Sequence, residues 1–146
     1  MAQFKNYSPQ FVTVSFNGVI LTGFADGTFV EVEREDDAFT KRVGSQGDVV
    51  RVQSMNRSGK ITVTLQNQSP TNDILAAFAL TDEQTGLGTG TIQIKDKNTA
   101  SIDPLAVSGV AWIMKLPKID RAKEATNSVW VFECAQLQLT PSGAVV

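Results

Sequence analysis

The residues in this sequence best suited to chemistry are two adjacent carboxylates, Asp36 and Asp37. Such a pair could act as an acid and a base, or could hold Mg²⁺ through its oxygen atoms. Arg34, Lys41 and Arg42 lie close by, so a solvated or inter-subunit charge patch is the more common arrangement. The chain has no histidine, which excludes Ser-His-Asp and Cys-His sites and most zinc sites. We therefore expect no catalytic residue, no metal site and no cofactor.

Three other motifs do not fit the chemistry that they resemble. The glycines between Gly86 and Gly90 lack the spacing of a dinucleotide-binding loop and follow a predicted helix instead of opening one. Gly59-Lys60 lacks the first glycine of a phosphate-binding loop, and Ile61 follows where Ser or Thr is needed. Cys134 is the one cysteine and lies in an apolar run, which indicates a buried, inert thiol.

Length and composition indicate one folded domain, residues 1–146, with 42% hydrophobic and 19% charged residues. The net charge of −2 gives no basic field that would hold nucleic acid tightly. The N-terminus lacks the apolar segment of a signal peptide, and no run of about 18 apolar residues occurs. We expect synthesis in the cytoplasm and no membrane partner.

Hydrophobic alternation predicts mostly β-strands. The expected elements are a hairpin of 11–16 and 19–24 turning at Asn17-Gly18, a strand at 28–33, a second hairpin of 49–55 and 60–67, and strands at 91–96, 110–116 and 128–139. The fold class is mainly β: two packed antiparallel sheets, as a sandwich or barrel, with one flanking helix.

The helix is expected at residues 72–85. Ser69 or Asn72 can cap its start, Asp73 suits the positive helix end, and Gly86 suits the left-handed position after its last turn. Residues 74–80 are apolar almost all round, which predicts a helix packed against a sheet.

A long loop is expected at residues 34–48, and its length needs an explanation. Loops beyond about 12–15 residues are uncommon unless they bind something or are disordered. Ala38, Phe39 and Val43 are its only apolar residues, too few for a local core. We expect it to be mobile in an isolated subunit.

The outer faces of the predicted strands form polar strips with little charge. The strips contain Thr62, Thr64 and Gln66, then Gln93 and Lys95, then Gln136 and Gln138. Monomeric β proteins usually protect their edge strands with charges, bulges or prolines. The strips fit either an ordinary sandwich with threonine-rich faces, or strand edges that pair with other copies in a closed ring.

The order of these features resembles the tail tube proteins of contractile-tailed bacteriophages. A strand ends in acidic residues, a long loop with Gly44 and Gly47 follows, and a hairpin leads to the Ser69–Asn72 segment and a helix. The likeness continues more weakly to the last strand, around Trp130, and so covers most of the chain. Tube proteins of type VI secretion systems and of phage-tail-like bacteriocins are similar in fold and remain alternatives.

The resemblance implies a subunit without catalytic activity that forms hexameric rings stacked into the hollow inner tube of the tail. Its partners would be further copies of itself, the sheath protein, the baseplate tube initiator and the tape-measure protein. DNA would pass through without tight binding. The protein would be made in the host bacterial cytoplasm and would reside in the virion.

The resemblance also gives the long loop a role, because in this family it reaches neighbouring subunits and the adjacent ring. Phe39 would be the apolar anchor. The residues with complementary charges across the ring interface, and the glycines that would let the backbone turn, are Glu35, Asp36, Asp37, Lys41, Arg42, Gly44 and Gly47.

Two other classes of function stay open. A β-sandwich binding module for a small ligand or a protein partner predicts a monomer or a dimer. An enzyme that uses Asp36 and Asp37 with a metal predicts stabilisation by divalent cations.

Overall fold

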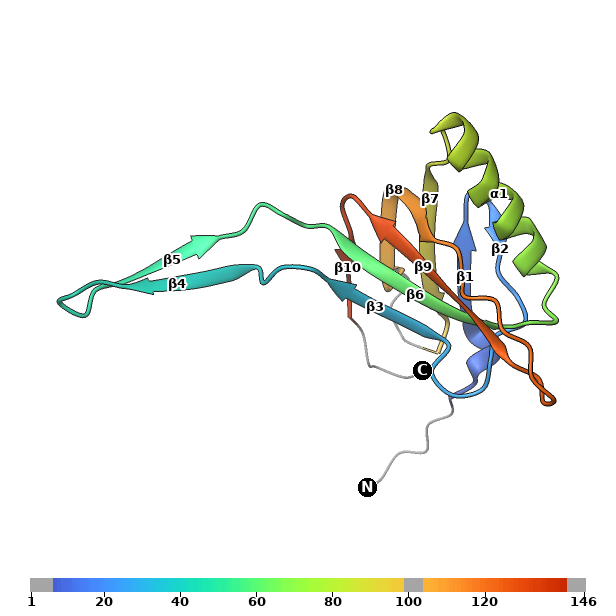
Figure 1. Ribbon diagram of the computed structural model, residues 1–146. Coiled ribbons are helices and arrows are strands. Elements are labelled where there is room, and N and C mark those ends of the chain that lie inside the picture. The colour runs from blue at the N-terminus through green and yellow to red at the C-terminus, as the bar shows by residue number, and fades with distance from the viewer. Residues whose placement is uncertain (1–6, 99–103, 142–146) are drawn as a thin grey trace, which may run out of the picture.

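The computed structural model describes residues 7–98 and 104–141, as a mainly β fold with one α-helix and a short 3₁₀ turn (Figure 1). The elements are η1 (Pro9–Phe11), β1 (Val12–Phe16), β2 (Val19–Ile20), β3 (Val30–Arg34), β4 (Phe39–Val43), β5 (Val49–Gln53), β6 (Gly59–Gln66), α1 (Thr71–Thr85), β7 (Gly90–Asp96), β8 (Ala106–Lys115), β9 (Asn127–Cys134) and β10 (Gln138–Leu139).

The strands form two antiparallel sheets. The larger sheet has eight strands in the order β2-β1-β7-β8-β9-β6-β3, with β10 also paired to β8. The smaller sheet is β4 paired with β5. The predicted class, mainly β with two antiparallel sheets and one helix, is confirmed. The two packed layers are the two halves of the larger sheet, while the smaller sheet projects from the body (Figure 1).

Strand β8 joins the two layers. Its first half pairs with β7 and β10, and its second half pairs with β9. The register with β7 shifts by an irregularity opposite Gly90 and Ile92, so the strand changes direction there. A bulge of this kind increases the local twist and lets one continuous sheet fold over onto itself.

The core lies between the layers and is closed on one side by α1. Inward residues alternate along the strands as predicted: Ile61, Val63 and Leu65 are fully buried on β6, and Glu31 and Glu33 are exposed on β3. The ring of Phe16 on β1 lies 5.0 Å from Phe132 on β9 and 4.9 Å from Phe78 on α1. The three rings thus connect both layers to the helix.

The helix begins at Thr71, one residue earlier than predicted, and ends at Thr85. Gly86 takes the predicted left-handed conformation with φ of 71°. Ser69 Oγ accepts a hydrogen bond from the Thr71 amide at 3.3 Å. Asn72 does not cap the helix. Its Nδ2 donates to the Gln66 carbonyl, and its Oδ1 accepts from Trp130 Nε1, both at 2.8 Å, so Asn72 ties the helix start to the sheet.

Replacing Asn72 with alanine should therefore lower the free energy of unfolding by about 1–3 kcal/mol. The change leaves the buried indole N–H of Trp130 without its partner, and an unpaired buried donor costs about that amount. Urea unfolding followed by tryptophan fluorescence measures the change. Gln84→Ala, at an exposed position of the same helix, is the control. Equal midpoints for the two variants would contradict the role given to Asn72.

The Cys134 thiol is fully buried, as predicted. Burial raises its pKa from 9.0 to about 11, with a smaller opposing effect from a hydrogen bond with Ser108. The raised pKa means that the folded state holds this proton more tightly than the unfolded state. Its contribution to stability is therefore complete below about pH 9 and is lost as the pH rises towards 11.

We expect the unfolding midpoint of the protein to fall more steeply between pH 9 and 11 than that of Cys134→Ala. The two midpoints, measured by urea titration at several pH values, should run in parallel between pH 7 and 8, about one unit or more below the thiol's ordinary pKa. Identical curves across the alkaline range would show that Cys134 titrates normally in the folded protein.

Three predicted strands differ clearly from the structure. The second strand of the first hairpin, expected at 19–24, is only Val19–Ile20. The expected strand at 128–139 is interrupted after Cys134, where the Ala135 amide donates to the Val110 carbonyl at 3.0 Å before β10 begins. Strand β8 starts at Ala106 instead of residue 110. Its buried Ser108 and exposed Gly109 break the apolar alternation at the bend of the sheet, which conceals the first half of the strand.

Residues 34–48 are not a loop, and the predicted pairing of 49–55 with 60–67 is wrong. Residues 39–43 form β4, which pairs with β5. Strand β6 lies between β3 and β9. The reason is burial: β6 has an inward face of fully buried residues and needs a neighbour on each side, whereas every residue of β5 is exposed.

Candidate functional site

The most prominent functional feature is an arm, residues 35–58, which projects from the body between β3 and β6 (Figure 1). Strands β4 and β5 pair in register from Phe39 opposite Gln53 to Val43 opposite Val49. The arm ends in a tight turn in which the Gly47 amide donates to the Gly44 carbonyl at 3.0 Å. Gly47 has φ of 89°, a conformation that glycine adopts at no steric cost.

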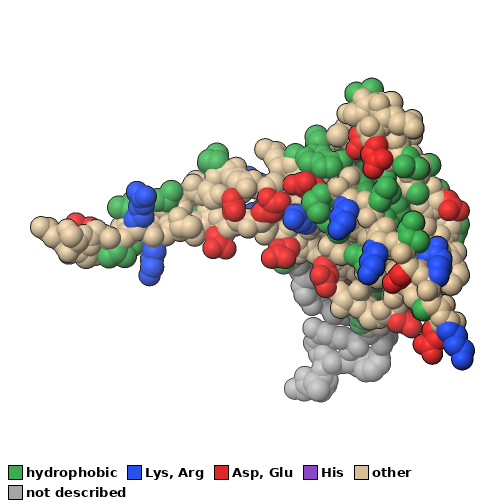
Figure 2. Space-filling view, viewed as in Figure 1, with side chains coloured by type: hydrophobic (Ala, Val, Ile, Leu, Met, Phe, Trp, Pro, Cys, Tyr) green, Lys and Arg blue, Asp and Glu red, His purple; other side chains and the backbone are tan. Residues whose placement is uncertain are grey.

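Both faces of the arm are open to solvent. One face carries Phe39, Lys41, Val43, Val49, Arg51 and Gln53, and the other carries Thr40, Arg42, Val50 and Val52. All ten residues are exposed. Figure 2 shows hydrophobic and basic side chains side by side along the arm. An isolated two-stranded ribbon is marginally stable in water, so this surface is suited to contact with another molecule.

Phe39, the predicted anchor, lies on the arm and is 45% exposed. The guanidinium carbon of Arg51 stands 4.2 Å from the centre of its ring, a cation–π contact. Sequence reasoning did not identify Arg51 or the valines of β5 as site residues. The available signal is the alternation of Val50 and Val52 with Arg51, which the predicted hairpin of 49–55 and 60–67 places in the body.

The predicted acidic residues lie at the base of the arm, whereas Asp48 lies beside the turn at its tip. Residues 35–38 and 54–58 form a joint outside the strand pairing, in which Asn56 Nδ2 donates to Asp36 Oδ2 at 2.8 Å. Ser58 Oγ donates to Glu35 Oε2 at 3.2 Å. Asp37 borders a shallow hollow beside Asp36 and Thr40. Glu35 and Asp36 therefore have a structural role in holding the joint.

The structure separates the predicted charges along the arm. Glu35, Asp36 and Asp37 lie at the joint, whereas Lys41 and Arg42 lie on β4, beyond it. Within residues 7–98 and 104–141, no group of three or more potential metal ligands occurs. Over the same residues, no helix has the length and apolar character that crossing a membrane requires.

The body holds the base of the arm through one buried residue, Leu137. Its carbonyl accepts from Arg34 Nε at 3.1 Å and from Arg34 Nη2 at 2.8 Å, and its amide donates to the Arg57 carbonyl at 2.8 Å. Gly59 packs against this point so closely that an added Cβ would lie 2.6 Å from the Glu33 carbonyl. No sequence motif marked Leu137 as the anchor.

The predicted polar strips lie on two layers of the body. Gln93 on β7 is opposite Ser15 on β1 and Val107 on β8, and Gln138 on β10 is also opposite Val107. These residues form one row across four strands. Lys95 lies two residues further along β7, and Gln136 lies in the turn before β10.

The other strip lies on the outer face of β6. Thr62 is opposite Glu31 on β3 and Val131 on β9, and Thr64 follows on the same face. Gln66 ends the strand. The structure therefore brings Thr62 with Thr64, and Gln93 with Gln138, into two separate surfaces.

Comparison with protein families identifies what kind of protein carries this arm. The family model for the bacteriophage PhiTE tail tube protein matches residues 7–140. The chain belongs to this family. A curated relative, structural protein ORF10 of Pseudomonas phage KPP10, is 31% identical over an alignment of 135 residues that covers 87% of this chain and 76% of the relative. The resemblance to phage tail tube proteins is thereby confirmed, and this tail tube protein is a structural component of the virion tail.

Solved structures of contractile injection systems share the fold of this tail tube protein. The tube-terminating cap of the anti-feeding prophage has a TM-score of 0.60 and 14% identity, over 96% of this chain and 94% of its own. The PVC sheath/tube terminator in the extended state also has a TM-score of 0.60, with 13% identity over 96% and 100%. A chain of the PVC sheath-tube complex has a TM-score of 0.56, with 13% identity over 92% and 93%.

Proposed function

We propose that copies of this tail tube protein form closed hexameric rings that stack into the hollow inner tube of a contractile tail. DNA passes through the tube during delivery. The observation that carries the proposal is the arm, whose ten strand residues are exposed on both faces. In a monomer, both faces of the arm would stay exposed to water. In a head-to-tail assembly, the next copy of the chain buries them.

The arm is the element that locks one ring to the next. Its outer half carries Lys41, Arg42 and Arg51, and its base carries Glu35 and Asp36. Repeated copies can set these opposite charges against one another across a ring interface, where they fix register more than affinity. Gly44 and Gly47 shape the turn that reaches the neighbour.

The tube acts by assembly and contains no catalytic centre, and residues 1–146 serve as one tail-tube domain. Partners are the sheath protein, a tube terminator, the baseplate initiator and the tape-measure protein. The likeness in fold to a PVC sheath/tube terminator and to a chain of the PVC sheath-tube complex supports the first two. The protein is made in the host bacterial cytoplasm and enters the virion by assembly.

One of the two polar surfaces lines the channel. The Gln93 and Gln138 row presents uncharged polar groups. The Thr62 and Thr64 face also carries Glu31, Glu33 and Glu133 with one cation, Lys60, and is acidic on balance. Such a lining lets DNA pass, because few cations contact its phosphates. We expect assembled tubes to bind duplex DNA weakly, with little dependence on salt concentration.

Negative-stain microscopy and light scattering of the concentrated protein test the proposal. Rings with sixfold class averages, and tubes built from them, are expected, with interfaces burying on the order of 2,000 Å² or more. A binding module for a ligand would give a sharp monomer or dimer mass at the same concentration. That result, with no rings in the microscope, would overturn the proposal.

Within the arm, Phe39→Ala should shorten tubes more than Lys41→Ala. A buried aromatic anchor contributes more to an interface than a charge at its rim, and the loss of Phe39 also removes the ring that Arg51 covers. Tube length distributions from microscopy measure the effect. Both side chains lie on the same face of β4, which makes Lys41→Ala a matched control. Equal tube lengths for the two variants would show that Phe39 is not an anchor of the interface.

A further inference from the structure

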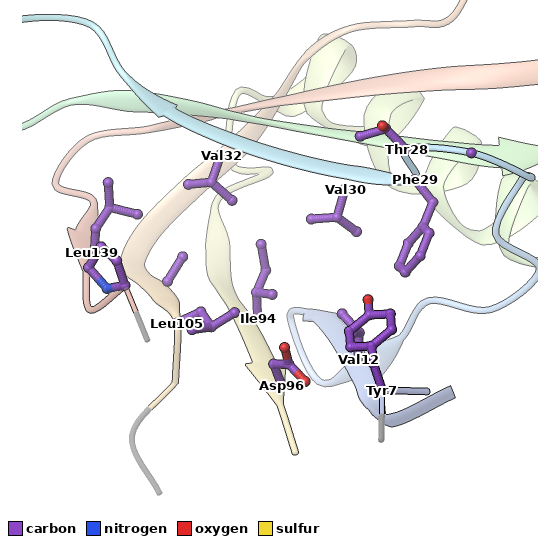
Figure 3. Close-up of a pocket in the computed structure, with 13 residues that line it drawn as sticks. Tyr7, Val12, Thr28, Phe29, Val30, Val32, Ile94, Asp96, Leu105 and Leu139 are labelled. Atoms are coloured by element: carbon purple, nitrogen blue, oxygen red, sulfur yellow. The ribbon is translucent and has the colours of Figure 1, made fainter. Parts of the chain in front are cut away.

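The body contains an apolar cavity of about 720 Å³ between β3 and β7, away from the arm. Figure 3 shows Val30 and Val32 on β3 pointing across it towards Ile94 on β7. Leu105 and Leu139 close it on further sides. The volume lies within the range of about 300–1,000 Å³ that is typical of sites holding a bound group.

Three polar side chains border this cavity, and Thr28 is one of them. Tyr7, which is 62% exposed, stands on one side of it, and the Asp96 carboxylate faces it from the end of β7 (Figure 3). Asp96 Oδ1 accepts hydrogen bonds at 2.8 Å from the amide and from the Nδ2 of Asn98, which fix its orientation. The cavity therefore suits aliphatic side chains, and the carboxylate at its edge favours a basic segment over an acidic one beside them.

The outer half of the arm has this chemistry. Val43 and Val49 are opposite one another next to the turn and are 60% and 63% exposed. Lys41 and Arg51 form the next pair on the same face. Residues 39–53 carry three cations and one carboxylate, whereas the chain as a whole has a net charge of −2. The outer half of the arm, residues 39–53, is therefore basic relative to the body that would receive it.

We propose that the Val43–Val49 pair of one copy inserts into the cavity between β3 and β7 of the next copy, with Lys41 and Arg51 beside Asp96. This docking rests on the proposed tube function and names the surface that receives the arm. Arm and cavity are different surfaces of the same chain, so the contact is heterologous and repeats from copy to copy. It buries two valines that no contact within the subunit covers.

Directed cross-linking of assembled tubes tests this docking. Two proteins are made in a Cys134→Ala background, one with Val43→Cys on the arm and a tag, and one with Tyr7→Cys at the cavity. They are mixed, assembled and treated with a short bismaleimide. Ala77→Cys, at an exposed position of α1, replaces Tyr7→Cys in the control mixture. The expected product is a tagged–untagged dimer with Tyr7→Cys, at least tenfold more abundant than with Ala77→Cys.

The outcomes separate the docking from the tube function. If tubes form and the Tyr7→Cys dimer does not exceed the control, the docking is wrong while the tube function stands. A small molecule found at one per chain by native mass spectrometry of the tubes would also overturn the docking, because it would occupy the cavity. If the unmodified protein, assembled alone under the same conditions, forms neither rings nor tubes, the proposed function fails and the docking fails with it.

Discussion

Joining Arg34 directly to Gly59 through an Asn-Gly turn should abolish tube formation and leave the body folded. Arg34 and Gly59 are paired across β3 and β6, so a two-residue hairpin turn can close the gap left by the arm. None of the buried core residues lies between residues 35 and 58. We therefore expect a melting temperature within a few degrees of the parent and a complete loss of stacked tubes by microscopy.

The control for this deletion is a change of another exposed segment. Residues 121–124 are exposed and lie outside the arm, so their replacement by Gly and Ser should leave tube length unchanged. Tubes of normal length from the armless protein would show that stacking uses another surface. A large fall in melting temperature would instead show that the arm supports the fold of the subunit.

The second large effect is expected in the core. Phe132→Ala should lower the free energy of unfolding by about 3–5 kcal/mol, because a fully buried ring is removed and leaves a cavity beside Phe16. The total free energy of unfolding of a typical domain is about 5–15 kcal/mol, so this loss would be a large share of the stability. Urea unfolding at 25 °C measures it.

Phe39→Ala is the matched control, because it makes the same chemical change on the arm. Surface substitutions usually change stability by no more than about 0.5 kcal/mol, so its unfolding midpoint should stay close to that of the parent. The two variants should thus show opposite defects, with stability lost in Phe132→Ala and assembly lost in Phe39→Ala. Similar unfolding midpoints would contradict the separation of core and arm.

Much of the body could be predicted from the sequence because its apolar side chains are buried inside the same subunit. Ile61, Val63 and Leu65 alternate with polar residues, and burial of these three side chains requires the alternation. The helix was predicted within one residue because Gly86 ends it in the way that glycine commonly does.

The arm could not be predicted in the same way, because its valines are exposed and none of them belongs to the core of the subunit. A hydrophobic pattern predicts which side chains are suited to burial. It does not indicate whether they are buried within their own subunit or against another copy of the chain. Residues 49–53 were correctly identified as a strand and were assigned the wrong neighbour for this reason. The cavity between β3 and β7 could not be predicted either, because residues from distant parts of the sequence form it.

The pairing of the sheet also sets an order of events during synthesis. Gly59 on β6 pairs with Cys134 on β9, about 75 residues later in the chain. At about 5–20 residues per second, β9 leaves the ribosome several seconds after β6. The hairpin of β4 and β5 is local and closes within about 1–10 μs. Each nascent chain therefore exposes the residues of the arm, as a hairpin that opens and closes, for seconds before the body that anchors it exists. During that interval, the cations between its valines act as gatekeepers against premature association.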